Sequence, residues 1–177
     1  MRATRNNGIE TIHQGAAVIQ DLVLDAVRGY VYWTTSHSLE SARLDGRGHE
    51  IIHAIPYFLG KYILGVALRY DDNAGSIYWL LKNGDKLILN QMALLTDDTA
   101  TQRSAILKVA KFRTTPLLSP VMHYYSGKLF WQGGRKDIIV LDIRGKSLAK
   151  LLVATSGDIE TFTLTHSSLY WLPVCPV

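Results

Sequence analysis

Four tryptophans recur at regular intervals along this sequence, and each directly follows a tyrosine or a phenylalanine. Successive tryptophans stand 46, 52 and 40 residues apart, which is the range of periods typical of four-stranded β-propeller blades. Repeats of this length bury their apolar faces mainly against neighbouring repeats, so the repeat limits the architecture more than any other feature does. The four pairs are Tyr32 with Trp33, Tyr78 with Trp79, Phe130 with Trp131, and Tyr170 with Trp171.

The residues on both sides of each pair predict strands joined by tight turns. An apolar segment precedes every pair, and a turn containing glycine or serine lies between them, as expected because tight hairpins need positive φ or small polar residues. A further β-branched or apolar segment follows three of the pairs. We therefore expect an all-β fold with at most about 10% helix and antiparallel strands within each blade. The predicted strands are 21–25, 30–34, 40–44 and 50–54 in one blade, 65–69, 76–81, 86–92 and 105–111 in the next, 121–125, 128–132, 138–143 and 149–154 in a third, and 160–164 and 169–172 in a fourth.

The aromatic pairs have a structural role in this interpretation. Adjacent residues on a strand point to opposite faces of the sheet. The two side chains of each pair are therefore predicted to fill the spaces toward both neighbouring blades, with the tryptophans buried on equivalent second strands. The alternative is a stacking platform for single-stranded nucleic acid, and the regular spacing favours packing.

The composition excludes several classes of protein. Hydrophobic residues make up 47% of the chain and charged residues 19%, which predicts an ordered core rather than disorder. The net charge of +4 is small and scattered, unlike the dense basic stripe of a nucleic-acid-binding protein. The most apolar stretch, residues 54–68, is broken by proline and glycine and is too short to span a bilayer. Cys175 is the only cysteine, and in a secreted protein we expect it to pair with a cysteine outside these residues.

No group of residues in the sequence has the spacing of an active site or a metal site. A nucleophile elbow and the glycine-rich, His-Arg-Asp and Asp-Phe-Gly motifs of kinases are absent. His49 and His53 are four residues apart, which on a strand separates them by about 13 Å, so a metal site would need other ligands. The acidic pairs at 71–72 and 97–98 lack the spacing of a calcium loop and are typical of turns. We predict no catalytic residue, no metal ion and no cofactor.

One stretch of the chain resembles a repeat of a known family. The segments LDAVRGYVYWTT (residues 24–35) and LESARLDG (residues 39–46) look like the LDL-receptor class B repeat, known for its YWTD tetrapeptide. The other copies have YWLL, FWQG and YWLP, and Thr35 stands where the family has an aspartate in a structural hydrogen-bond network. Degenerate repeats of this kind are similar to those of sevenless/Ros-type receptor tyrosine kinases.

The resemblance implies a six-bladed propeller, of which this chain would form about four blades. A ring of six would need about 250 residues at the usual length of a blade, so we expect the 177 residues to be one partial propeller domain of a longer protein. The expected divisions are 1–20, with residues 9–13 as the outer strand of a preceding blade, then blades at 21–60, 61–116 and 117–156, and the start of another at 157–177.

The function implied by the resemblance is that of a non-catalytic extracellular segment of a cell-surface receptor. Such a segment would bind a protein ligand or adjoining ectodomain modules, or act as a spacer, without binding nucleic acid or inserting into the membrane. Two other classes stay open. One is a propeller enzyme of the lactonase or strictosidine-synthase-like class, and the other is an intracellular propeller scaffold.

One rim of the propeller is the expected docking surface. Loops between second and third strands and between consecutive blades emerge on the same rim, which would carry five basic residues against Asp85 and Asp137, together with exposed aromatic residues. Cations beside exposed aromatic side chains are typical of interface hot spots, and we expect an acidic protein surface to dock there. The predicted residues are Tyr57, Phe58, Lys61, Lys82, Lys86, Arg135 and Lys136, with Tyr62 nearby, and the opposite rim would carry Asp45, Asp71, Asp72, Asp97 and Asp98.

Overall fold

The structure is a computed structural model in which residues 2–3, 9–15, 17–71, 74–94, 106–113, 121–145, 147–152, 159–164 and 169–173 are described. Within these ranges the chain forms sixteen strands and one short 3-10 helix, η1 (Tyr57–Leu59). The predicted all-β fold is therefore confirmed. Eleven backbone pairings join the strands, and all of them are antiparallel.

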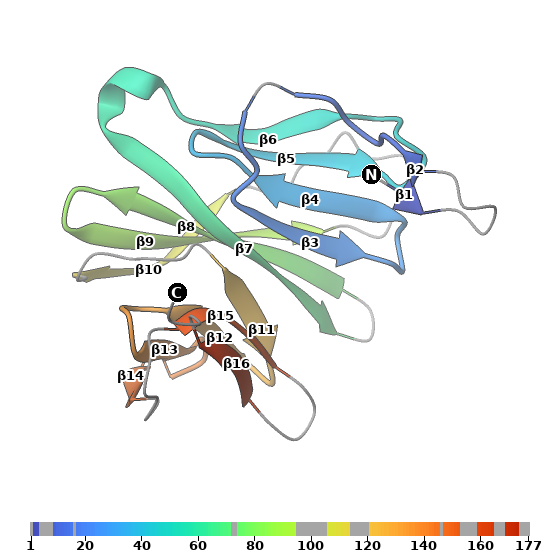
Figure 1. The fold of residues 1–177 in the computed structure, drawn as a ribbon. Helices are drawn as coiled ribbons and strands as arrows, with labels where there is room; N and C mark the ends of the chain where they lie inside the picture. The colour runs from blue at the N-terminus through green and yellow to red at the C-terminus, as the bar shows by residue number, and fades with distance from the viewer. Residues whose placement is uncertain are drawn as a thin grey trace.

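Three four-stranded sheets follow one another along the chain, each in simple sequence order (Figure 1). The first sheet has β3 (Asp21–Asp25), β4 (Tyr30–Thr34), β5 (Ser38–Arg43) and β6 (Glu50–Ala54). The second has β7 (Lys61–Asp71), β8 (Ala74–Asn83), β9 (Lys86–Leu94) and β10 (Leu107–Arg113). The third has β11 (Met122–Tyr125), β12 (Lys128–Gln132), β13 (Asp137–Asp142) and β14 (Ser147–Leu152). Two strand pairs flank them, β1 (Arg2–Ala3) with β2 (Ile9–Glu10), and β15 (Ile159–Leu164) with β16 (Leu169–Pro173).

The turns between first and second strands use residues that tolerate positive φ. Ser126 and Gly127 both have positive φ, 47° and 79°, between β11 and β12. A two-residue turn with both central residues in this region matches the right-handed twist of the strands that it joins. The Ser-Gly sequence therefore sets the register in which Tyr125 pairs with Lys128.

Most of the predicted strand ends lie within two residues of the observed ones, and two larger differences have identifiable reasons. β7 begins at Lys61 rather than at residue 65, because a bulge between Ile63 and Val66 allows pairing with β8 to continue across Gly65. Of the stretch predicted as a strand over residues 9–13, only Ile9–Glu10 is a strand, paired with Arg2–Ala3. Ile12 instead packs its side chain against the face of the first sheet.

Apolar cores fill the spaces between successive sheets, and the aromatic pairs lie at their centres. Trp79 packs toward the first sheet against Tyr32, and Tyr78, next to it on β8, packs toward the third sheet against Trp131. Phe130 in turn packs toward β15. Adjacent aromatic residues on one strand therefore join two interfaces, as the alternation of side chains requires.

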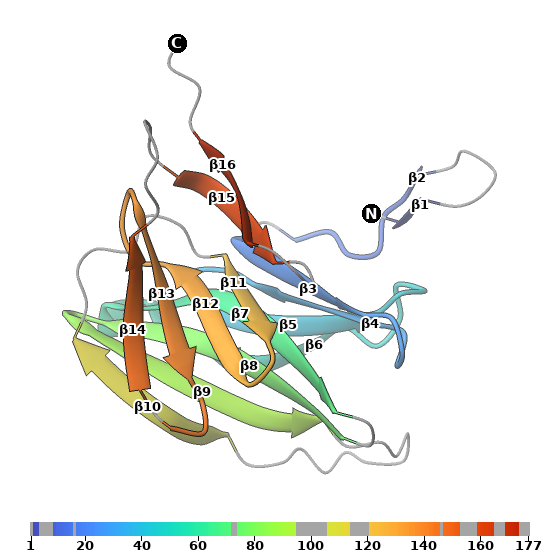
Figure 2. The ribbon, with the colours of Figure 1, turned by 90° about the horizontal axis from the view of Figure 1, so that it is seen from below.

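The innermost strands of the three sheets meet around Asp21. In Figure 2, β3, β7 and β11 run side by side through the middle of the molecule. Asp21 Oδ2 accepts hydrogen bonds from the backbone N–H of Val66 at 2.9 Å and of Met122 at 3.2 Å. One carboxylate therefore links the inner strands of all three sheets, as expected of blades arranged around a common axis.

Candidate functional site

The described structure contains two candidate sites: the rim that the sequence predicts as a docking surface, and a cluster on the outer face of the first sheet. The rim is built around η1, which joins β6 to β7. Tyr57 and Phe58 are 79% and 86% exposed. The ring of His37, from the turn between β4 and β5, lies 4.1 Å from the Tyr57 ring and 5.7 Å from the Tyr62 ring.

The predicted basic residues occupy the same rim in two groups. Lys61 pairs with Asn83, which also pairs with Lys86, so these lysines and Lys82 gather at the β8–β9 hairpin. This hairpin, η1 and the β12–β13 turn all lie at the left of Figure 1. The exposed residues Arg135 and Lys136 belong to that turn.

Two acidic residues lie near the rim. Lys150 lies 2.6 Å from Asp137 and offsets its charge, and Asp85 is exposed at the tip of the β8–β9 hairpin. Of the acidic residues expected on the opposite rim, Asp45 lies on the turn after β5. The side chain of Asp71 and residues 72, 97 and 98 lie outside the described residues.

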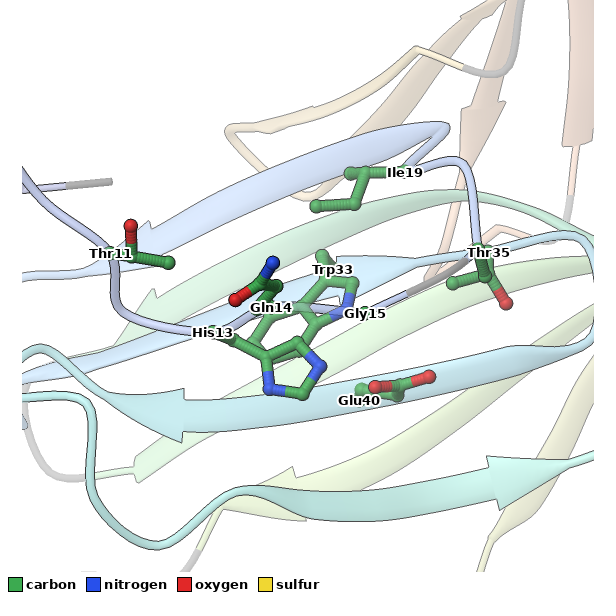
Figure 3. A pocket seen from close by; sticks show the side chains of 9 residues that line it. Thr11, His13, Gln14, Gly15, Ile19, Trp33, Thr35 and Glu40 are labelled. Atoms are coloured by element: carbon green, nitrogen blue, oxygen red, sulfur yellow. The ribbon is translucent and has the colours of Figure 1, made fainter.

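Three aromatic rings stack on the face of the first sheet that points away from the second sheet. Trp33 on β4 is 3% exposed. His49, just before β6, stacks on Trp33 at 5.7 Å and 16°, and His13 stacks on His49 at 4.1 Å and 20°. His13 and Trp33 are also in contact, with ring centroids 5.3 Å apart, and Figure 3 shows the imidazole in front of the indole.

Glu40 completes the cluster from the neighbouring strand. It pairs with Trp33 across the β4–β5 ladder, and its side chain is only 12% exposed. His49 Nε2 donates to Glu40 Oε2 at 2.7 Å. The ligand atoms of His13, Glu40 and His49 all lie within 4.8 Å of one another.

A chain of hydroxyl groups holds the Glu40 carboxylate from its other side. Ser38 Oγ donates to Glu40 Oε1, and the Thr35 hydroxyl lies 2.6 Å from Ser38 Oγ. Thr35 Oγ1 also accepts from the backbone N–H of His37 and of Ser38. Thr35 therefore organises this turn and the hydrogen-bonded chain that leads from it to Glu40.

The electrostatic environment of Glu40 favours its ionised form. Burial acts to raise its pKa, but the hydrogen bonds from Ser38 and His49, together with the nearby charges of His49 and His13, lower the pKa below its usual value. A largely buried carboxylate facing two imidazoles is the kind of arrangement in which proteins hold cations or protons.

The cluster opens into a cavity of about 440 Å³. His13, Trp33, Thr35 and Glu40 line one part of it, and Thr11, Gln14, Gly15, Ala17 and Ile19 line the rest (Figure 3). A second, more apolar cavity of about 360 Å³ shares His13, Ile19 and Trp33 and extends over Leu22 and Leu24.

Sequence reasoning missed this cluster and considered only the pair His49 and His53. The structure keeps these two histidines apart, because His53 accepts a hydrogen bond from Trp79 Nε1 at 3.0 Å in the interface with the second sheet. Burial there lowers the pKa of His53. No spacing rule joins His13 to Glu40 and His49, since they come from three segments that meet only in the folded sheet.

The repeat residues lie on the second strands of their sheets, namely β4, β8, β12 and β16. Trp33, Trp79 and Trp131 are 3%, 0% and 2% exposed. The side chains of Tyr170 and Trp171 lie outside the described residues, although the backbone of both belongs to β16.

No protein-family model matches the chain. Proto-oncogene tyrosine-protein kinase ROS of Homo sapiens is 32% identical over 156 residues, and so is the protein of the same name from Gallus gallus. Each match covers 88% of this chain and 6% of the relative, so the chain spans only a small part of the length of the curated relatives that it matches. The matched part is not the kinase region, since the chain is all-β and lacks kinase motifs.

Two solved structures share the fold at low identity. Glutaminyl cyclase of Myxococcus xanthus is 16% identical, with a TM-score of 0.55 over 89% of this chain and 62% of that chain. The complex of the fission yeast SREBP-SCAP binding domains is 10% identical, with a TM-score of 0.52 over 90% of this chain and 44% of that chain. Similarity at this level concerns architecture alone. The chain is therefore a partial β-propeller that is homologous to a non-kinase segment of the ROS receptor tyrosine kinase.

Proposed function

We propose that this chain is an extracellular, non-catalytic segment of a sevenless/Ros-type receptor, and that it binds an acidic protein surface through the rim around η1. The relationship to ROS supports a receptor segment. The three-residue η1 is the only helical segment in the described part of the chain, far below the roughly 20 residues of a helix that crosses a bilayer.

We also propose that the segment resembling the LDL-receptor class B repeat is a YWTD-type repeat, and the way in which it joins two blades supports this. Asp25 is fully buried and accepts from the backbone N–H of Arg28 at 2.9 Å. The Arg28 guanidinium lies 3.3 Å from Asp25 and donates to the Leu94 carbonyl of the second sheet at 3.0 Å. Gly75 leaves room for it, since a Cβ there would lie 2.4 Å from Arg28 Nη1. Arg28 therefore links the first blade to the second through its contacts with Asp25 and the Leu94 carbonyl, a structural role that a repeat would need.

The observation that carries the binding proposal is the exposure of Tyr57 and Phe58. Large aromatic side chains left almost entirely in solvent are uncommon, and exposed apolar side chains that gather on one surface mark interaction sites. The His37 ring lies 4.1 Å from the Tyr57 ring and 5.7 Å from the Tyr62 ring, so these residues extend the aromatic surface. The aromatic residues would supply buried contact area, and the neighbouring cations would select an acidic partner and speed its approach.

Photo-crosslinking tests this proposal on the intact receptor at the cell surface. A photoreactive phenylalanine analogue at position 58 should crosslink a protein, and the charge reversals Lys82→Glu and Arg135→Glu should greatly reduce the yield. The matched control places the same analogue at Asp45 on the opposite rim, where the product should be absent. Equal crosslinking from both rims, or a yield that the charge reversals leave unchanged, would contradict the proposal.

A further inference from the structure

We propose that His13, Glu40 and His49 form a binding site for a divalent transition-metal ion of the class that includes Zn²⁺. This inference does not depend on the docking rim, because the cluster lies on the outer face of the first sheet. It concerns a site that the sequence alone predicts to be absent.

The geometry of the cluster is close to that of a zinc site. Ligand atoms around a tetrahedral zinc ion, with bonds of about 2.0–2.1 Å, lie about 3.3 Å apart. Glu40 Oε2 and His49 Nε2 are 2.7 Å apart, and all three ligand atoms lie within 4.8 Å. Moving the Glu40 and His49 atoms slightly apart and turning the His13 ring inward by about 1.5 Å or less would therefore bring the set to coordination distance. His49 would bind the ion as the tautomer that carries its proton on Nδ1, so that Nε2 is free to coordinate.

The ligand types select a transition metal rather than calcium. Imidazole nitrogen suits zinc, nickel and copper, whereas calcium takes six to eight oxygen ligands. Two histidines and one glutamate also form the three-ligand set with which proteins bind zinc while leaving a fourth position open. Here the fourth position would face the cavity of about 440 Å³ that His13 and Glu40 line.

The surroundings of the cluster already orient its ligands. Ser38 donates to Glu40 Oε1, which leaves Oε2 directed toward His49. The Trp33 ring stacks against the His49 ring, with the ring centroids 5.7 Å apart, and supports it on the side of the sheet. Gly15 accommodates the His13 ring, since a Cβ there would lie 3.0 Å from His13 Nε2. Such outer contacts fix the orientation of metal ligands and raise affinity.

An ion at this site would join three separate segments of the first blade. His13 lies before β3, Glu40 lies on β5, and His49 immediately precedes β6. The ion would therefore fasten residues 11–15 over Trp33 and stabilise the outer face of the sheet. Its open position would accept one more ligand from solvent or from a neighbouring module.

Calorimetric titration of the 177-residue chain with Zn²⁺ tests the proposal. The parent chain and every variant carry Cys175→Ser, so that the single thiol cannot bind zinc. The ligand variants are His13→Ala, His49→Ala and Glu40→Gln, and the last keeps a hydrogen-bond acceptor for His49 and hence the local fold. Asp45→Asn is the matched control for Glu40→Gln, because Asp45 is an exposed carboxylate on the turn after β5 and is not part of the cluster.

The parent chain should bind one Zn²⁺, and each ligand variant should weaken binding at least about tenfold. Binding should also raise Tm, since the ion binds the folded chain. Co²⁺ should give the visible absorption of a four-coordinate site in the parent chain and lose it in the ligand variants. Asp45→Asn should match the parent chain throughout. The absence of saturable one-to-one binding, or equal affinity in the parent chain and in a His13→Ala, His49→Ala double variant, would overturn the proposal.

Discussion

The carboxylate of Asp21 accepts a hydrogen bond from the backbone N–H of Met122 at 3.2 Å, although 101 residues separate the two in the sequence. The same oxygen accepts from Val66 at 2.9 Å, so one side chain holds the inner strands of three blades together. This contact makes blade-to-blade packing depend on one ionisable group, and two of the predictions below test that dependence.

Removing the acceptor at position 21 should destabilise the chain. In Asp21→Ala the N–H groups of Val66 and Met122 lose their partner, whereas Asp21→Asn keeps an acceptor oxygen. We expect the alanine variant to have a free energy of unfolding about 1–3 kcal/mol below that of the asparagine variant. Urea denaturation of both variants measures this difference, and neither variant carries a charge. Equal stabilities would mean that water replaces the Asp21 oxygen.

Stability should also depend on the ionisation of Asp21. Burial is the main cause that raises its pKa from 3.8 to about 6, while hydrogen bonds from Val66, Met122 and Leu22 act to lower it. Between these two values the folded state binds more protons than the unfolded state. The contribution of Asp21 to stability is therefore fully present below about pH 4 and is lost as the pH rises through 6, by up to about 3 kcal/mol.

The measurement compares the free energy of unfolding at pH 5 and pH 7.5 in wild type and in Asp21→Asn. The wild type should lose more stability than the variant on going to the higher pH, because the variant cannot titrate at this position. Identical pH slopes in the two proteins would show that the carboxylate is well hydrated in the folded state.

At His53, lowering the pH should reduce the stability of the chain, which is the opposite of its effect at Asp21. Burial lowers the pKa of this histidine in the folded state, while Trp79 Nε1 donates to its unprotonated Nδ1. Below its ordinary value of about 6.5 the unfolded state takes up a proton that the folded state resists, so stability falls as the pH falls. His53→Gln should flatten this slope between pH 7 and 5 in chemical denaturation. A slope that stays the same would assign the acid sensitivity to His123, whose pKa burial also lowers.

The tryptophans should differ in their contributions to stability. Trp79 lies in the core between two complete sheets, whereas Trp33 is covered by Ile12 and two histidine rings. Trp79→Ala should cost about 3–5 kcal/mol, the usual range for a buried tryptophan, and Trp33→Ala should cost less because its covering segment can rearrange. Guanidinium denaturation of both variants gives the comparison. A larger loss from Trp33→Ala would show that residues 11–15 pack as firmly as a blade.

The outer face of the first sheet should cause the isolated chain to associate. Leu22 and Leu24 are each 53% exposed and pair across the ladder with Trp33 and Val31, so they continue one apolar surface. Light scattering should show oligomers at high concentration, and Leu22→Glu should shift the chain toward monomer. Val27→Glu is the control, since Val27 is 79% exposed on a turn between β3 and β4. A monodisperse wild-type monomer would contradict this prediction.

The sequence by itself determined the repeat and therefore the class of fold. An aromatic residue followed by tryptophan, an apolar strand before it and a small-residue turn between them are local features, and local features set strand identity and hairpin register. They predicted the second strands that carry Trp33, Trp79 and Trp131, and the turn at Ser126 and Gly127. The exposure of Tyr57 and Phe58 agrees with the expectation that they belong to a loop rather than to a blade junction.

Only the tertiary structure decided which distant residues meet. In the sequence, Asp21 is indistinguishable from any other polar residue at the start of a strand. In the fold, its carboxylate accepts hydrogen bonds from the inner strands of two other blades. His13, Glu40 and His49 become neighbours because residues 11–15 fold back across the sheet rather than continue as a strand. Periodicity describes a residue's place within its own repeat. The contacts between repeats depend on how whole sheets pack, which no local pattern in the chain encodes.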